Sequence, residues 1–159
     1  MAVTQSALQR ELKQSRPFPS VDAEALIGIL RTSVLLEREL NAVVATAGLT
    51  LPQYNVLRIL RGAGPDGLPT LAIRDRMLDA SPGVTRLLDK LEAAGRVRRE
   101  RCSPDRRQVM CYITTAGLDV LTQLDPPLLA YDRRALDVLT DDEKEVLISL
   151  LDRIRAARD

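Results

Sequence analysis

Arginine side chains are the residues of this chain whose type and spacing point most directly to a chemistry. Six arginines fall between positions 96 and 107, where only Glu100 and Asp105 oppose them, while the whole chain carries a net charge of only +1. Guanidinium groups make charge-assisted hydrogen bonds with phosphate and guanine. A basic segment on an otherwise mildly acidic chain therefore predicts a local anionic partner, and we expect double-stranded DNA.

Residue types that carry catalysis or bind metals are scarce by comparison. The chain has no histidine and two cysteines, Cys102 and Cys111, which removes the commonest general base and the usual zinc ligand sets. The glycine-containing stretch 62–67 follows a predicted helix rather than a strand, so it does not fit a phosphate-binding loop. We expect no enzyme, no metal site and no cofactor.

The elements that must position these arginines follow from the hydrophobic pattern. Apolar residues recur at three- and four-residue steps, which predicts a mainly α-helical chain. Thr50 with Gln53 and Thr140 with Glu143 have the spacing of capping boxes, and Thr114 is placed to cap a third helix. Two alternating stretches predict a small β-hairpin with a basic tip. The predicted helices are 21–47, 50–62, 69–78, 82–94, 115–138 and 140–154, and the predicted strands are 97–101 and 108–113.

Two consecutive short helices followed by a basic hairpin are the outline of a winged helix-turn-helix. The second helix fits the major groove of DNA, and the first helix braces it. Ser81 is expected as its N-cap and Pro82 as its first helical residue. The bracing side chains are expected to be Leu71, Ile73, Met77 and Leu78 against Val84, Leu87 and Leu91. The residues expected to face DNA are Ser81, Pro82, Gly83, Thr85, Arg86 and Lys90.

The hairpin tip supplies the second predicted contact with DNA. Asp105, Arg106 and Arg107 stand together on the turn between the two strands. A guanidinium on a narrow tip can reach the minor groove, where the potential is most negative. Asp105 repels phosphate, so we expect it either to orient a neighbouring arginine or to bond the backbone of the turn.

The chain from Gly48 to Gly117 resembles the MarR family of bacterial regulators. The similar segments are 48–54, the recognition-helix stretch 84–95, and Asp105-Arg106-Arg107 followed by Ile113-Thr114-Thr115-Ala116-Gly117. The resemblance implies a homodimer with interlocked N- and C-terminal helices on a pseudo-palindromic operator whose half-sites lie roughly 34–36 Å apart. It also implies a repressor that a small-molecule effector releases, with Arg107 in the minor groove and Asp105 as its organiser.

These elements divide the chain into three functional regions. Residues 1–20 are expected to form a flexible arm, 21–47 and 115–159 a helical dimerisation region, and 48–114 the winged helix-turn-helix lobe. Pro126-Pro127 is expected to kink or restart the helix that contains it. No apolar run approaches the ~20 residues that span a bilayer, and 1–20 lack a signal peptide's apolar core, so we expect a cytoplasmic protein that does not use a membrane.

Two alternatives stay open at this point. A winged helix that has lost DNA binding would be a protein-interaction module, although such a module has no need of a basic tip. A thiol-based regulator would use Cys102, whose pKa the neighbouring Arg98, Arg99 and Arg101 would lower; Cys111 alternates with apolar residues and is expected to be an inert core thiol. Tyr54 and Arg58 are possible effector-pocket residues, with packing and surface roles as the favoured interpretation.

Overall fold

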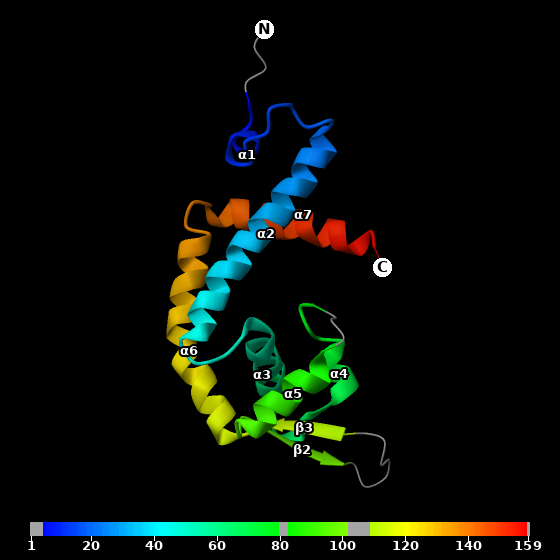
Figure 1. Cartoon of the computed structure of the whole chain (residues 1–159), viewed down its shortest axis with the longest axis vertical. Coiled ribbons are helices and arrows are strands. Elements are labelled where there is room, and N and C mark those ends of the chain that lie inside the picture. The colour runs from blue at the N-terminus through cyan, green and yellow to red at the C-terminus, as the bar shows by residue number, and fades with distance from the viewer. Residues whose placement is uncertain (1–4, 80–82, 102–108, 159) are drawn as a thin grey trace. The chain divides into compact units, whose positions relative to one another are not determined.

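The computed structural model describes residues 5–79, 83–101 and 109–158. These residues form two compact units, Met1–Glu39 and Leu40–Asp159, and the division falls inside helix α2 (Val21–Ala45). The chain is drawn in Figure 1, where colour follows residue number. This division into compact units does not test the predicted functional regions, which are 1–20, 21–47 with 115–159, and 48–114. Those regions remain predictions.

The first unit contains a short helix that the sequence analysis did not predict. Helix α1 (Ala7–Glu11) begins after Ser6, whose hydroxyl and the side chain of Gln9 form a reciprocal capping box. The Gln9 side-chain amide also donates to the carbonyl of Arg16 at 3.1 Å. Glu11 pairs with Arg31 of α2 at 2.7 Å, so α1 is fastened to the first part of α2.

The second unit is built around helix α3 (Leu51–Ala63), which contacts helix α5 (Val84–Ala93), helix α6 (Thr115–Ala135) and strand β3 (Val109–Ile113). The predicted capping box of α3 is confirmed: the Gln53 amide donates to Thr50 and the Gln53 side chain accepts from the Thr50 amide. The core consists mainly of aliphatic side chains. Its fully buried members include Val44, Val56, Leu57, Leu60, Ile73, Leu88, Leu91, Cys111, Leu121 and Leu124.

Among the described residues the sheet has three antiparallel strands in the order β1-β3-β2, where two were expected. Strands β2 (Val97–Arg101) and β3 form the predicted hairpin, with Val97 opposite Ile113. Strand β1 (Leu68–Pro69) pairs with β3 and was missed because two residues, one of them proline, carry no periodic signal. The turn before β1 requires glycine: Gly67 has φ +63°, and a Cβ there would lie 2.5 Å from the Cys111 carbonyl.

The helix-turn-helix differs from the prediction at both of its helices. Helix α4 (Thr70–Arg74) is followed only by turns, so the helical period does not reach Leu78, which is exposed. Leu71 is also exposed, because it lies two positions from the buried Ile73 and therefore on the opposite side of the helix. The predicted bracing contacts of Leu71 and Leu78 are wrong, whereas Ile73 and Met77 belong to the core.

Helix α5 begins two residues later than expected. Its first residue is Val84 and its N-cap is Gly83, which has no side chain to cap with. The predictions of Ser81 as N-cap and Pro82 as first helical residue concern residues outside the described part of the chain. Its end agrees with the prediction, because Gly95 adopts φ +69° just past the last turn.

Helices α6 and α7 (Asp141–Ala156) complete the second unit. The predicted caps are confirmed, since Thr114 accepts from the amide of Gly117 and Thr140 forms a capping box with Glu143. Helix α6 continues through Pro126 and Pro127, so the expected restart of the helix is wrong. No residue of α7 is buried by the described chain.

Candidate nucleic-acid interface

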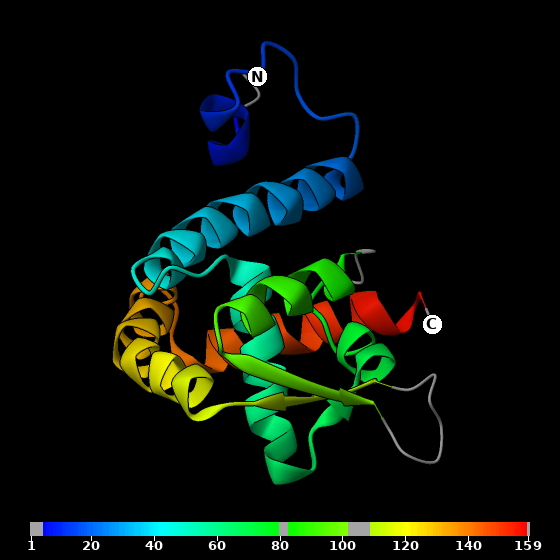
Figure 2. The same ribbon diagram turned by 60° about the horizontal axis from the view of Figure 1, so that its bottom comes forward.

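Helix α5 separates a buried face from an exposed face that can meet a ligand. Val84, Leu88 and Leu91 are buried in the core, and this apolar spacing turns the intervening positions outward. Figure 2 shows α5 running alongside the β2–β3 hairpin. The exposed residues of α5 include Thr85, Arg86, Asp89 and Lys90, and half-buried Gly83 directly precedes the helix.

The positive charges on this face are available to a ligand. Among the described residues, no carboxylate pairs with Arg86 or Lys90, and the carboxylate of Asp89 pairs with Arg99 of β2 rather than with Arg86. Thr85 adds an exposed hydroxyl beside Arg86. The face therefore offers hydrogen-bond donors suited to phosphate oxygens and base edges.

Arg99 connects the first hairpin strand to α5 through two carboxylates. Its Nε donates to Glu92 Oε2 at 2.8 Å, its backbone amide donates to Glu92 Oε1 at 3.2 Å, and its Nη2 lies 2.7 Å from Asp89 Oδ1. These hydrogen bonds lower the pKa of Glu92 and raise the pKa of Arg99, so the group stays charged. The sequence analysis missed this connection, because it treated Arg99 only as a source of positive charge for its sequence neighbours and for an anionic partner.

Two further arginines of the basic segment are occupied by the fold itself. Arg96 donates to the carbonyls of Ala47 and Gly48 at 3.2 and 3.4 Å, which ties the start of β2 to the loop after α2. Arg98 lies over the ring of Tyr112, 4.3 Å from its centroid, and pairs with Glu100. These arginines therefore add less free positive charge than their number in the sequence indicates.

The remaining basic residues of the hairpin lie at and beyond the end of β2. Arg101 is the last residue of that strand and is exposed. The predicted wing residues Asp105, Arg106 and Arg107 lie outside the described residues, as do Ser81 and Pro82. The structure thus brings Gly83, Thr85, Arg86 and Lys90 together and leaves the roles of the other five as predictions.

The thiol and the acidic groups of the described chain do not form a reactive or metal site. Cys111 is fully buried, as expected for a core thiol, and burial raises its pKa. Its sulfur lies 3.7 Å from Thr70 Oγ1. Cys102 lies outside the described residues. Within the part of the chain that the structure describes, no group of three or more Cys, Asp or Glu could hold a metal ion.

Tyr54 and Arg58 have roles in packing and at the surface. Tyr54 is half-buried against the core, and burial raises the pKa of its hydroxyl. Arg58 is exposed and donates to Asn55 Oδ1 at 3.3 Å. These contacts agree with the interpretation favoured from the sequence.

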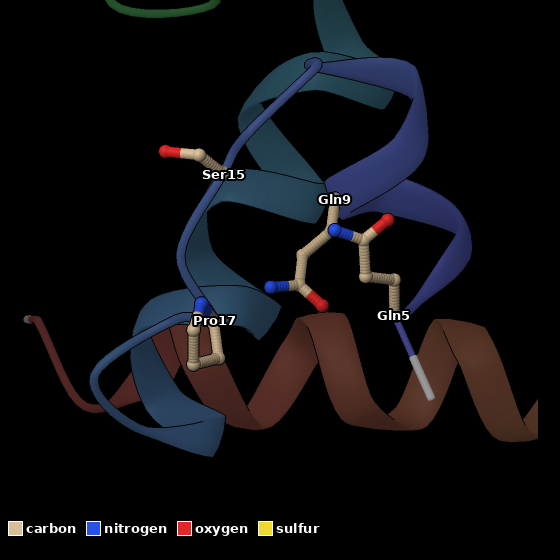
Figure 3. Close-up of a pocket in the computed structure, with 4 residues that line it drawn as sticks. All are labelled: Gln5, Gln9, Ser15 and Pro17. Carbon is tan, nitrogen blue, oxygen red and sulfur yellow. The ribbon is translucent and has the colours of Figure 1, made fainter. Parts of the chain in front are cut away.

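A small open pocket of about 140 Å³ lies in the first unit, where Gln5, Gln9, Ser15 and Pro17 line it (Figure 3). The amide group of Gln9 is already bonded, as donor to Arg16 and as acceptor from the amide of Ser6. The pocket therefore presents no unpartnered buried group that would select a ligand.

Apolar side chains stay uncovered on α7. Leu147, Leu150, Leu151 and Ile154 recur at three- and four-residue steps along one side of the helix, and three of them are more than a third exposed. In the first unit, Leu26, Leu30 and Val34 of α2 are likewise exposed. No helix among the described residues is long and apolar enough to cross a membrane.

Comparison with known proteins places these features among transcriptional regulators. Residues 49–109 match the MarR family. The chain is 32% identical to the HTH-type transcriptional regulator TtmR of Methylorubrum extorquens over 140 residues, which cover 88% of this chain and 68% of that protein.

Two crystal structures show the same architecture. The MarR transcription factor of Planctomyces limnophilus is 36% identical, with a TM-score of 0.67 over 85% of this chain and 98% of that one. A mutant of MarR from E. coli, complexed with operator DNA, is 25% identical, with a TM-score of 0.73 over 94% of this chain and 99% of that one.

Proposed function

Because this chain belongs to the MarR family of transcriptional regulators, we propose that it is a homodimeric repressor that binds a pseudo-palindromic operator and is released by a small-molecule effector. Its work is regulation rather than catalysis, and it acts in the cytoplasm, where the chromosome is accessible. The exposed face of α5 carries this proposal, since Thr85, Arg86 and Lys90 stand on it beside a buried apolar face that holds the helix in place.

The proposed contacts with DNA divide between the two grooves. Helix α5 enters the major groove, where Arg86 binds guanine or phosphate, Thr85 and Ser81 bond base or phosphate, and Lys90 contacts the backbone. Pro82 and Gly83 precede the helix, and the lack of a side chain at Gly83 lets the helix approach the DNA closely. The wing places Arg107 in the minor groove, with Arg106 beside it on phosphate and Asp105 as the organiser of the arginines. The mutant MarR from E. coli that is complexed with operator DNA, and is 25% identical to this chain, supports DNA binding by this fold.

The homodimer is supported by apolar surface that one chain leaves exposed. Helix α7 buries none of its residues in the described chain, although Leu147, Leu150 and Ile154 follow a helical stripe. A stripe of this kind is stable in water when a second copy covers it. A two-fold dimer also matches a palindromic operator.

The proposed effector acts by a shift of population. A ligand that favours a spacing of the two lobes mismatched to the operator weakens DNA binding by its differential affinity for that state. Among the described residues, no cavity identifies the effector. In the redox alternative, oxidation of Cys102 changes the affinity for DNA. The wild-type protein would then bind DNA differently under oxidising and reducing conditions, whereas Cys102→Ser would bind equally under both.

The first experiment titrates the purified protein against a duplex upstream of its own gene and against a scrambled duplex, at several salt concentrations. We expect the dimer to bind the first duplex more tightly, with an affinity that falls steeply as salt rises. Arg107→Ala is expected to weaken that binding by about 1–3 kcal/mol through loss of the minor-groove contact.

Arg133→Ala is a matched control, because it removes one exposed arginine from the last turn of α6, away from the proposed interface. If the upstream duplex binds no better than the scrambled one, an operator is selected from random duplexes instead. Failure of every selected duplex, with no effect of Arg107→Ala, would leave the protein-interaction module as the function.

A further inference from the structure

The DNA-facing side of α5 contains a negative charge that the proposed function does not explain. Asp89 is exposed on the same face as Arg86 and Lys90, one turn further along the helix than Thr85. A carboxylate in this position repels phosphate and would lower affinity for DNA. The structure holds a basic side chain from another element against it, which is Arg99 of β2.

Arg99 is less exposed than the residues of an ordinary surface ion pair, and it contacts two carboxylates instead of one. Its side chain is 23% exposed, while those of Asp89 and Glu92 are 56% and 39% exposed. The guanidinium spans both carboxylates, which are three residues apart on α5, and the backbone amide of Arg99 adds a third hydrogen bond. A planar group with five donors can make this arrangement, whereas lysine would act as a single point charge.

The neighbouring arginine of the same strand has a different environment. Arg98 pairs with Glu100 and lies over Tyr112 of β3, and every one of its described contacts is within the hairpin. Arg98 and Arg99 are adjacent in a strand and therefore point to opposite faces of the sheet. Arg99 thus bonds across to α5, and Arg98 does not.

We propose that Arg99 is a positioning residue for operator recognition, which holds the first wing strand in register with the recognition helix and cancels the charge of Asp89 on the DNA-facing side. This inference rests on the proposed function. Specific binding requires α5 and the wing to contact their grooves at the same time. A shift of β2 relative to α5 therefore lowers affinity for the operator more than affinity for non-specific DNA.

The test compares substitutions of Arg99 with matched substitutions of Arg98. Both Arg99→Gln and Arg98→Gln remove one positive charge from β2, and only the first breaks the link to α5. Dissociation constants are measured by fluorescence anisotropy for a duplex selected from random sequences and for its scrambled counterpart. We expect Arg99→Gln to raise the operator constant by about tenfold more than the scrambled constant, and Arg98→Gln to raise both by the same factor.

A second arm separates charge from folding. Adding Asp89→Asn to Arg99→Gln removes the uncovered carboxylate, so part of the lost operator affinity should return without recovery of the thermal midpoint. If Arg99→Gln does not fold, Arg99→Lys replaces it in the test, because lysine keeps the positive charge. Arg98→Lys is then the matched control. Arg99→Lys should retain affinity for scrambled DNA and lose part of the operator preference.

The outcomes distinguish this inference from the proposed function. If the wild-type protein prefers its operator and the Arg99 variants keep that preference within about twofold, Arg99 is a structural residue and the inference is wrong. If the wild-type protein itself shows no preference for any selected duplex, the proposed function fails and the inference fails with it.

Discussion

At the scale of single residues, the chain uses the same side-chain type for two purposes. Arg96, Arg98 and Arg99 make hydrogen bonds or ion pairs within the fold, whereas Arg86 on α5 pairs with no carboxylate of the described chain. The sequence shows all of them as equal positive charges. Only the partners around each guanidinium separate those that hold the lobe together from those that are free to bind DNA.

The Glu92–Arg99 pair makes the stability of the lobe depend on pH in a defined direction. Hydrogen bonding to Arg99 lowers the pKa of Glu92 in the folded protein below its ordinary value of 4.5. The stabilisation is therefore fully present above pH 4.5 and is lost as the pH falls through the folded pKa. Glu92→Gln should lower the free energy of unfolding at neutral pH, by an amount that shrinks on acidification.

This prediction is checked by urea unfolding at a series of pH values. Glu145→Gln is a suitable control, because Glu145 is an exposed carboxylate of α7. A Glu92→Gln variant that loses the same free energy at neutral and at acidic pH would contradict the assignment.

At the scale of elements, close backbone contacts determine how the helices meet the sheet. Helix α6 begins against the turn between α5 and β2. There the hydroxyl of Thr114 donates to the carbonyl of Gly95, and the backbone amide of Thr114 donates to the carbonyl of Arg96. Gly117 lies in the first turn of α6, and a Cβ there would be 2.4 Å from the Arg96 carbonyl. The absence of a side chain at Gly117 therefore allows the first turn of α6 to pack against the backbone of Arg96.

Gly117→Ala should accordingly destabilise the protein by about 1–3 kcal/mol, because the backbone of Arg96 cannot move aside as a side-chain end would. Gly62→Ala is the matched control: Gly62 lies in the last turn of α3 with nothing within 4 Å of its added Cβ. That variant should be unchanged or more stable by up to about 1 kcal/mol, since alanine favours helix. Chemical unfolding of both variants measures the difference, and equal stabilities would show that α6 adjusts freely.

A second prediction for the elements concerns the turn into β1. Gly67 and Gly64 both have positive φ, but only Gly67 would place a Cβ against the Cys111 carbonyl and the ring of Tyr112. Gly67→Ala should therefore cost roughly 1–3 kcal/mol more than Gly64→Ala. The difference between the two unfolding free energies isolates the clash from the cost of the backbone conformation, and no difference would mean that β1 separates from β3 without penalty.

At the scale of the whole molecule, the exposed apolar stripe of α7 is the feature that a single chain does not explain. Leu150 and Ile154 are 46% and 41% exposed, although their spacing is that of a packed helix. The proposed dimer would cover them. DNA binding to two half-sites would then depend on residues far along the chain from α5.

Replacing both Leu150 and Ile154 by Glu should therefore convert the proposed dimer to a single chain of 17.6 kDa and weaken operator binding. Val138→Glu is the control, because Val138 is 84% exposed and lies between α6 and α7. Sedimentation or light scattering measures the mass. A double variant that keeps the mass of the wild type would place the dimer contact elsewhere, and a wild type of 17.6 kDa would contradict the dimer.

Features that depend on residues close together in the chain could be predicted from the amino-acid sequence. The capping residues Thr50, Thr114 and Thr140 act within three positions, so their helix starts were predicted correctly. The helical and strand periodicities identified the helices other than α1, the hairpin and the exposed face of α5. The family motifs in 49–109 added the class of function, which belongs to short segments in a set order.

Contacts between residues of different elements could not be predicted in this way, because they depend on how the chain folds in three dimensions. Strand β1 forms because β3 lies beside it and pairs with it. Helix α6 continues through Pro126 and Pro127 and packs on α3. Arg99 became a link to Asp89 and Glu92, rather than one more basic side chain, because β2 folds back along α5. Such contacts depend on the relative placement of whole elements, and no local spacing in the sequence encodes that placement.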